Sequence, residues 1–191
     1  MRKTCLEPDA AFSNNDYWFS DQEAERATFF LEEFCRHVKG PLAGNVLRLE
    51  QWQRNLTREL FGWKKQNGAR RFRYVWIEAP CKAGKTTLLA SLGLYMLVVD
   101  PEPGAEIVIA AGNTEHASVC FNIAREMVLR DPDLSTVCRI YRNRLVYKDA
   151  HLRAISSRQE AVSGSNISCL LVDDVSLQPS RELHDRLITS M

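Results

Sequence analysis

The sequence predicts an α/β protein with a mainly parallel sheet and helices on both faces. Two short apolar segments, FRYVWIEA (72–79) and AEIVIAAG (105–112), each precede a segment of helical length. A third apolar segment, SCLLVDD (168–174), comes later and ends in paired acids. Strands that alternate with helices in this way are joined by right-handed crossovers, which make the strands parallel.

The composition is that of an ordinary globular protein. Of the 191 residues, 45% are hydrophobic and 26% are charged, which suits a single core. The formal net charge of +1 gives no global reason to expect a nucleic-acid or membrane partner. Six cysteines are scattered singly, and no apolar stretch resembles a signal peptide or a membrane span. We therefore expect a soluble intracellular protein with reduced thiols.

Helical patterns dominate the region before the first of these strands. Ser20 and Glu23 have the spacing of a capping box, and apolar residues then recur at helical spacing until Gly40-Pro41. The segment EQWQRNLTRELFG (50–62) predicts a second helix that ends at a glycine.

The strand at 72–79 is aromatic and β-branched, so we expect it to be buried on at least one face. The segments after it predict, in order, a buried helix (85–99), a strand (105–112), a helix (114–130), a hairpin (138–149), a short strand (151–156), the strand that ends in paired acids, and a terminal helix from Ser180.

The loop APCKAGKTT (79–87) lies between a predicted strand and a predicted helix. In that setting, backbone N–H groups and the helix N-terminus bind phosphate. Gly84 permits the tight backbone, Lys85 would reach the β- and γ-phosphates, and the Thr86 hydroxyl would bind Mg²⁺. Position 79 holds alanine where the usual GxxxxGK[ST] pattern has glycine. For the loop alone, a chance turn before a helix remains the alternative.

The paired acids supply a second element of a nucleotide site. They stand at the carboxyl end of a strand, where open α/β sheets bind their ligands. Asp173 would hold Mg²⁺ through water, and Asp174 would orient or deprotonate the attacking water. Together with the loop, they predict an ATP or GTP site.

These motifs resemble the ATPase domain of the large terminase subunit of tailed bacteriophages and prophages. The likeness rests on LRLEQWQRNLTRELFGW, on the segment from APCKAGKTT through NIAREMV, and on LLVDDVSLQPSRELHDRLITSM. It implies a P-loop ATPase domain over residues 41–191, preceded by an N-terminal helical segment over residues 1–40. A sequence that stops at Met191 would lack the family's nuclease domain and one strand of the sheet, so we expect the fold to be incomplete at its C-terminus.

The resemblance also implies roles for individual residues. Gln53, which follows Trp52, would contact adenine, and Asp173 and Asp174 would form the Walker B pair, with Asp174 as the catalytic base. Thr189-Ser190 would couple hydrolysis to movement of the DNA. Lys85 would be catalytic, Thr86 would share the Mg²⁺ with Asp173, and the ATP-binding residues of the Walker A loop would be Ala79, Lys82, Ala83, Gly84, Lys85, Thr86 and Thr87.

The activity that the resemblance implies is an ATP-driven, Mg²⁺-dependent motor that moves duplex DNA into a preformed capsid. Its partners would be duplex DNA, the small terminase subunit and the portal protein. The motor would act as a ring of identical subunits in the cytoplasm of the host cell, without a membrane partner and without nuclease activity in this chain.

One departure from the family leaves alternatives open. Ala79 matches a variant loop of the family, but Asp174 stands where the family normally has glutamate. Aspartate is one methylene shorter, and catalytic geometry tolerates little displacement. The chain would then be an ATP-binding interaction module, or a prophage remnant, without turnover. An unrelated helicase-like or kinase-like P-loop enzyme is a further alternative, disfavoured because later helicase motifs and a substrate lid are absent.

A cluster of cations precedes the loop, at Lys64, Lys65, Arg70, Arg71 and Arg73. Such a cluster could engage DNA phosphates or could simply be a solvated loop.

Overall fold

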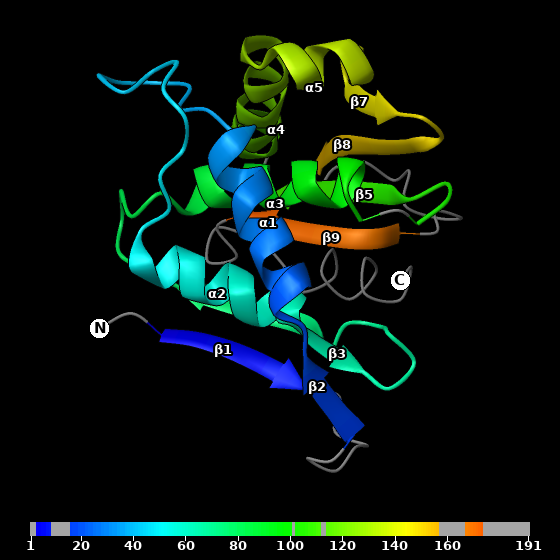
Figure 1. The fold of residues 1–191 in the computed structure, drawn as a ribbon. Coiled ribbons are helices and arrows are strands. Elements are labelled where there is room, and N and C mark those ends of the chain that lie inside the picture. The colour runs from blue at the N-terminus through cyan, green and yellow to red at the C-terminus, as the bar shows by residue number, and fades with distance from the viewer. Residues whose placement is uncertain (1–2, 9–15, 101, 112–113, 157–166, 174–191) are drawn as a thin grey trace. The chain divides into compact units, whose positions relative to one another are not determined.

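A computed structural model describes residues 3–8, 16–100, 102–111, 114–156 and 167–173 (Figure 1). The chain divides into two compact units, Met1–Glu33 with Val46–Lys85 and Phe34–Asn45 with Thr86–Met191. Three sequence predictions lie outside the described residues: Asp174, the helix from Ser180 and the coupling motif at Thr189-Ser190.

The first unit contains two helices and two small antiparallel sheets. Helix α1 (Asp21–Glu33) packs against helix α2 (Gln51–Gly62). One sheet pairs β2 (Tyr17–Phe19) with β3 (Trp63–Lys65), and the other pairs β1 (Lys3–Pro8) with β4 (Phe72–Glu78). Residues 1–40 thus contain two strands that the sequence patterns did not predict.

Helix α1 begins where the sequence predicts but ends earlier. The Ser20 hydroxyl accepts a hydrogen bond from the Glu23 backbone N–H at 3.3 Å, which is the first half of the predicted capping box. The backbone N–H of Ser20 donates to the Gly62 carbonyl at 2.8 Å, so the end of α2 provides its partner. The helix stops at Glu33, well before Gly40.

Strand β4 is less buried than its aromatic composition predicts. Phe72 is buried, but Tyr74 is 46% exposed and Trp76 is 53% exposed. The physical reason is that β4 pairs with β1 in a sheet of only two strands, as far as the described residues go. The prediction of a strand at this position is confirmed, and the prediction that one face is buried is wrong.

The second unit is built on a five-stranded sheet in the order β6-β7-β8-β5-β9. Its strands are β5 (Glu106–Ala111), β6 (Arg139–Ile140), β7 (Arg144–Tyr147), β8 (Ala150–Ser156) and β9 (Ile167–Asp173). Strand β5 is parallel to both β8 and β9, whereas β6, β7 and β8 are joined as antiparallel pairs (Figure 1). This arrangement confirms the predicted α/β class, including the hairpin at 138–149.

The helices of the second unit are α3 (Lys85–Val98), α4 (Thr114–Arg130) and α5 (Pro132–Val137). Helix α3 approaches the sheet closely at Gly93, where a Cβ atom would lie 2.9 Å from methyl groups of Leu152 and Leu171. Helix α4 buries the face that its periodicity predicts, at Ala117, Cys120, Phe121, Ala124 and Val128.

Helix α5 is a short element that the sequence reading missed. Asp131 caps it by accepting a hydrogen bond from the Leu134 backbone N–H at 3.0 Å, and Pro132 follows in the first turn. Asp131 also accepts a 2.8 Å charged hydrogen bond from Arg36. The Asp-Pro pair was the available signal for this helix. Across the described part of the chain, no helix is both long and apolar enough to cross a membrane.

Close packing at the end of α2 provides a test of the first unit. A Cβ atom at Gly62 would lie 2.4 Å from the Phe19 ring, which itself packs edge-on against Trp63 with 5.3 Å between ring centroids. We predict that Gly62→Ala lowers the free energy of unfolding by about 1–2 kcal/mol, because overpacking outweighs the gain in helix propensity. Asn55→Ala, at an exposed position of α2, is the control and should change it by less than about 0.5 kcal/mol. Urea denaturation measures both, and a Gly62→Ala protein as stable as the control would contradict this packing.

Candidate nucleotide-binding site

The loop between β4 and α3 has an unusual backbone. Lys82 has a φ angle of 65° and Gly84 a φ angle of 80°, both in the left-handed region. Glycine adopts this region freely, whereas a lysine adopts it at a cost of order 1 kcal/mol. The Ala83 N–H donates to the Pro80 carbonyl at 3.2 Å and closes a turn inside the loop. Strained backbone of this kind is typical of functional loops.

Lys85 lies folded back over this loop. It is the first residue of α3, and its ammonium group donates to the Ala79 carbonyl at 2.8 Å and to the Pro80 carbonyl at 3.1 Å. A cation is therefore held against the loop at the start of a helix, whose free N–H groups also favour an anion. The side chains of Lys82 and Cys81 are exposed, and Ala79 and Ala83 are partly buried.

Gln53 connects helix α2 to the same loop. Its side chain is buried, its Oε1 accepts from the Glu50 N–H at 2.9 Å, and its Nε2 donates to the Ala83 carbonyl at 3.4 Å. Glu50 completes a reciprocal cap by accepting from the Gln53 backbone N–H. A Cβ atom at Gly84 would lie 3.2 Å from Gln53 Nε2, so a side chain at this position would also crowd the Gln53 amide.

This contact gives Gln53 a structural role that the sequence reading did not foresee. Its predicted contact with adenine stays a prediction, since both ends of the amide are engaged within the protein. Glu50 was also missed, although an acid three residues before a glutamine is a variant of the capping-box pattern.

The two predicted Mg²⁺ ligands lie in the second unit, and Cys120 lies beside both. Cys120 is fully buried on α4, and its thiol donates to the Thr86 carbonyl at 3.8 Å. Burial, together with the nearby negative charge of Asp173, raises the pKa of the Cys120 thiol. Asp173 ends strand β9 and is 8% exposed. Sequence patterns gave no signal for Cys120 beyond its place on a buried helix face.

Thr86 and Asp173 carry the kinds of oxygen atom that Mg²⁺ takes from a protein. No group of three or more His, Cys, Asp or Glu side chains that could hold a metal occurs among the described residues. Mg²⁺ is usually bound through one or two protein oxygens, with water and phosphate supplying the rest of its octahedron. A threonine hydroxyl and one carboxylate provide that minimal protein set. Thr87, the next residue, uses its carbonyl to accept from the Ser91 hydroxyl within α3 at 2.9 Å.

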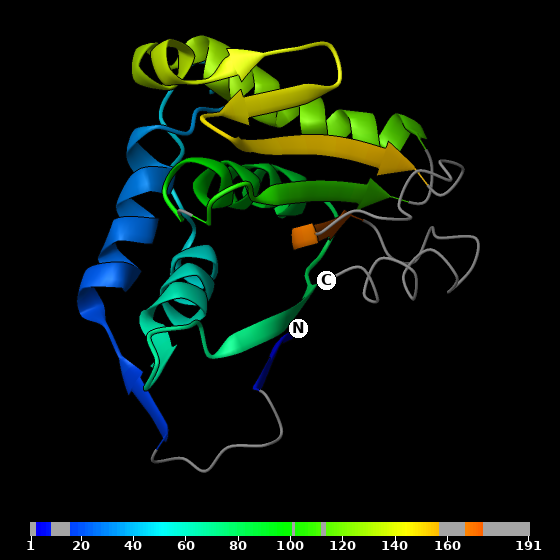
Figure 2. The same ribbon diagram turned by 90° about the vertical axis from the view of Figure 1, so that its right-hand side faces the viewer.

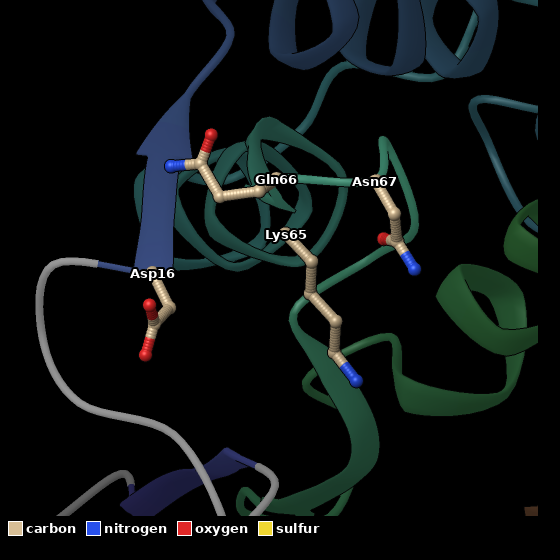
Figure 3. A pocket seen from close by; sticks show the side chains of 4 residues that line it. All are labelled: Asp16, Lys65, Gln66 and Asn67. Atoms are coloured by element: carbon tan, nitrogen blue, oxygen red, sulfur yellow. The ribbon is translucent and has the colours of Figure 1, made fainter.

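A separate pocket of about 200 Å³ lies in the first unit and is not part of this loop. It is lined by Asp16, which precedes β2, by Lys65 at the end of β3, and by Gln66 and Asn67 in the turn that follows (Figure 3). Because its lining contains one acidic and one basic side chain, the pocket has no strong electrostatic field of either sign. None of the residues 79–87 lines the pocket. We assign it no role in nucleotide binding.

The cation cluster at 64–73 is largely occupied by the packing of the first unit. Lys64 lies 3.6 Å from Glu23, and its side chain is 14% exposed. The Arg71 guanidinium lies over the rings of Tyr17, Trp63 and Phe72 at 4.4, 5.1 and 5.2 Å from their centroids. The Arg70 guanidinium lies 6.0 Å from the centroid of the Phe61 ring. Three of the five cations therefore pack against other residues of the first unit.

Comparison with known proteins identifies the family. A family model described as "Terminase large subunit, ATPase domain" matches residues 51–191. The chain belongs to this family. The large terminase subunit of Enterobacteria phage HK97 is 32% identical over 118 residues, which are 61% of this chain and 22% of that protein. A crystal structure of the HK97 bacteriophage large terminase has the same fold, with a TM-score of 0.73 at 22% identity over 88% of this chain.

Both relatives are much longer than the aligned part. The chain spans less than a quarter of the HK97 sequence relative and 35% of the HK97 chain in the crystal structure. The comparisons thus establish the terminase ATPase family and its fold for this chain.

The Gln53 contact yields a prediction for the loop. Gln53→Ala leaves the Glu50 N–H and the Ala83 carbonyl without their amide partner, so we expect the free energy of unfolding to fall by about 1–3 kcal/mol. Backbone amides of residues 81–84 should also exchange with deuterium faster than in the wild type. Gln51→Ala, at an exposed position of the same helix, is the matched control. Unchanged exchange in the loop of Gln53→Ala would show that the contact does not hold it.

Proposed function

We propose that this chain binds Mg·ATP through the loop at 79–87 and hydrolyses it as the ATPase module of a DNA-packaging motor. The observation that carries the proposal is the loop itself: left-handed backbone at Lys82 and Gly84, with the Lys85 ammonium folded over it at the start of α3. Membership of the terminase ATPase family supports ATP as the nucleotide.

Each residue of the site has a defined task in this proposal. Lys85 exchanges its loop carbonyl partners for the β- and γ-phosphate oxygens of ATP, which are stronger acceptors because they are charged. Thr86 and Asp173 hold Mg²⁺, which neutralises charge on the phosphates when it is bound. Asp174 orients the attacking water and accepts its proton as the bond from the γ-phosphorus to ADP breaks.

At the level of the whole motor, hydrolysis would drive duplex DNA into a capsid in the host cytoplasm. The small terminase subunit and the portal protein would be the protein partners, and a ring of identical subunits would surround the DNA. The similarity to the HK97 large terminase supports this assignment.

A second candidate is an ATP-binding module without turnover. The specific observation in its favour is aspartate at position 174, where a longer glutamate would reach further toward the attacking water. Nucleotide binding and hydrolysis must therefore be measured separately.

The test combines Mg·ATP titration calorimetry with steady-state phosphate release, each with and without duplex DNA. We expect Lys85→Ala to weaken ATP binding by at least about tenfold, since it removes charged hydrogen bonds to the phosphates. Lys39→Ala removes an exposed lysine elsewhere and should bind like the wild type. Wild type that fails to bind Mg·ATP would refute both candidates. Binding without phosphate release, restored by Asp174→Glu, would select the second.

A further inference from the structure

The antiparallel end of the five-stranded sheet carries a concentration of positive charge. Residues 139–153 contain five basic residues and one acidic residue, in a chain whose net charge is only +1. They form the strands β6, β7 and β8, at the edge of the sheet opposite β9 (Figures 1 and 2). The basic residues are Arg139, Arg142, Arg144, Lys148 and Arg153, and the acidic residue is Asp149.

The strand register places much of this charge on one face of the sheet. Arg139 pairs with Val146, Val146 pairs with His151, and Arg144 pairs with Arg153. Paired residues of neighbouring strands share a face, and residues two apart along a strand share it too. Arg139, Arg144, His151 and Arg153 therefore lie on the same face.

The opposite face of these strands is apolar and packed. Leu145 and Leu152 pair across β7 and β8, and both are 0% exposed. Burial of this face fixes the register, because a slip of one residue would send the leucines to the other side. The backbone positions that carry the arginines on these strands are consequently fixed.

One acid on the basic face is already paired. Glu106 on β5 stands opposite His151, and it accepts hydrogen bonds from Arg153 at 2.8 and 2.5 Å. Arg139, Arg142 and Arg144 are exposed, and they form no ion pair with a carboxylate in the part of the chain that the structure describes. A net positive surface therefore remains.

The positive charge of Arg144 affects other residues on this face, as the pKa of His151 shows. Burial lowers the pKa of His151, and the guanidinium groups of Arg153 and Arg144 lower it further, while Glu106 opposes them. An anion would be attracted by the same positive field.

Aromatic rings hold two of the exposed cations. The Arg144 guanidinium lies 4.9 Å from the ring centroid of Tyr141, which is 45% exposed, and Lys148 Nζ lies 5.1 Å from the ring centroid of Tyr147. A guanidinium that stacks on a ring keeps the N–H groups at its edge available for an acceptor. Tyrosine hydroxyls are themselves common donors to phosphate oxygens.

We propose that Arg139, Arg142, Arg144 and Lys148, with Tyr141, form a surface that binds the sugar-phosphate backbone of duplex DNA. We name it the hairpin surface, and its place in a motor rests on the proposed function. Arginine recognises phosphate through paired N–H donors. The core of a protein–protein interface is depleted in charged residues, whereas four of the five residues of the hairpin surface are charged. Contacts to phosphate alone are independent of sequence, which suits a protein that moves along DNA.

The test uses the full chain without nucleotide and a labelled duplex of mixed sequence, followed by fluorescence anisotropy at several salt concentrations. The triple variant Arg139→Gln/Arg142→Gln/Arg144→Gln should lose at least about tenfold in affinity, and its salt dependence should fall by about 0.9 for each phosphate contact removed. The matched control, Lys65→Gln/Arg70→Gln/Arg73→Gln, removes the same charge from the first unit and should bind within about twofold of the wild type. The triple Arg→Lys variant of the hairpin surface, which keeps the charge, should retain most of the affinity.

Three results would overturn the proposal. The first is a hairpin variant that binds DNA as tightly as the wild type, and the second is an equal loss of DNA affinity in the control. The third comes from poly-glutamate, which serves as a model of an acidic protein. If the hairpin variant loses binding to poly-glutamate but keeps its DNA affinity, the surface binds an acidic protein partner. Circular dichroism checks that each variant is folded. The DNA-binding assay contains no nucleotide, so it does not depend on the proposed ATPase. If DNA binding requires the hairpin surface but the chain fails to bind ATP, only the proposed ATPase is contradicted. ATP hydrolysis without hairpin-dependent DNA binding would contradict only this inference.

Discussion

The structure of the candidate site depends on a tight turn of backbone that only a few residues tolerate. The loop passes through the left-handed region at both Lys82 and Gly84, and the amide of Gln53 contacts it from α2. A side chain at Gly84 would be strained by its φ angle and crowded by Gln53. The turn leads directly into Lys85, so the conformation of the loop determines where this cation lies.

In the second unit, Thr86 and Asp173 also lie beside a closely packed residue. Cys120 fills a buried position beside them, and its raised pKa keeps it a neutral thiol that donates to the Thr86 carbonyl. Cys120 is thus a small side chain without charge beside Asp173, the last residue of β9.

Local patterns predicted most of the second unit but missed contacts that depend on the folded chain. The spacing of apolar residues predicted α3 and α4, and alternation around Arg142-Asn143-Arg144 predicted the hairpin. The pairing of β1 with β4 could not be predicted, because register between distant strands leaves no local signal. The loop was predictable from its glycine and lysine. The link from Gln53 to Ala83 was not, because it joins residues 30 apart in sequence.

The most direct test of the central claim is protection of Cys81 by Mg·ATP. Cys81 is exposed in the loop, whereas Cys35, Cys120 and Cys138 are buried, and burial raises the pKa of Cys35 to about 12 and that of Cys138 to about 11. The rate at which a thiol reagent alkylates Cys81, followed by peptide mass spectrometry, therefore reports occupancy of the loop. If the loop binds the phosphates, saturating Mg·ATP slows alkylation of Cys81 in the wild type and has little effect in Lys85→Ala. An unchanged rate in the wild type at saturating Mg·ATP would contradict the account.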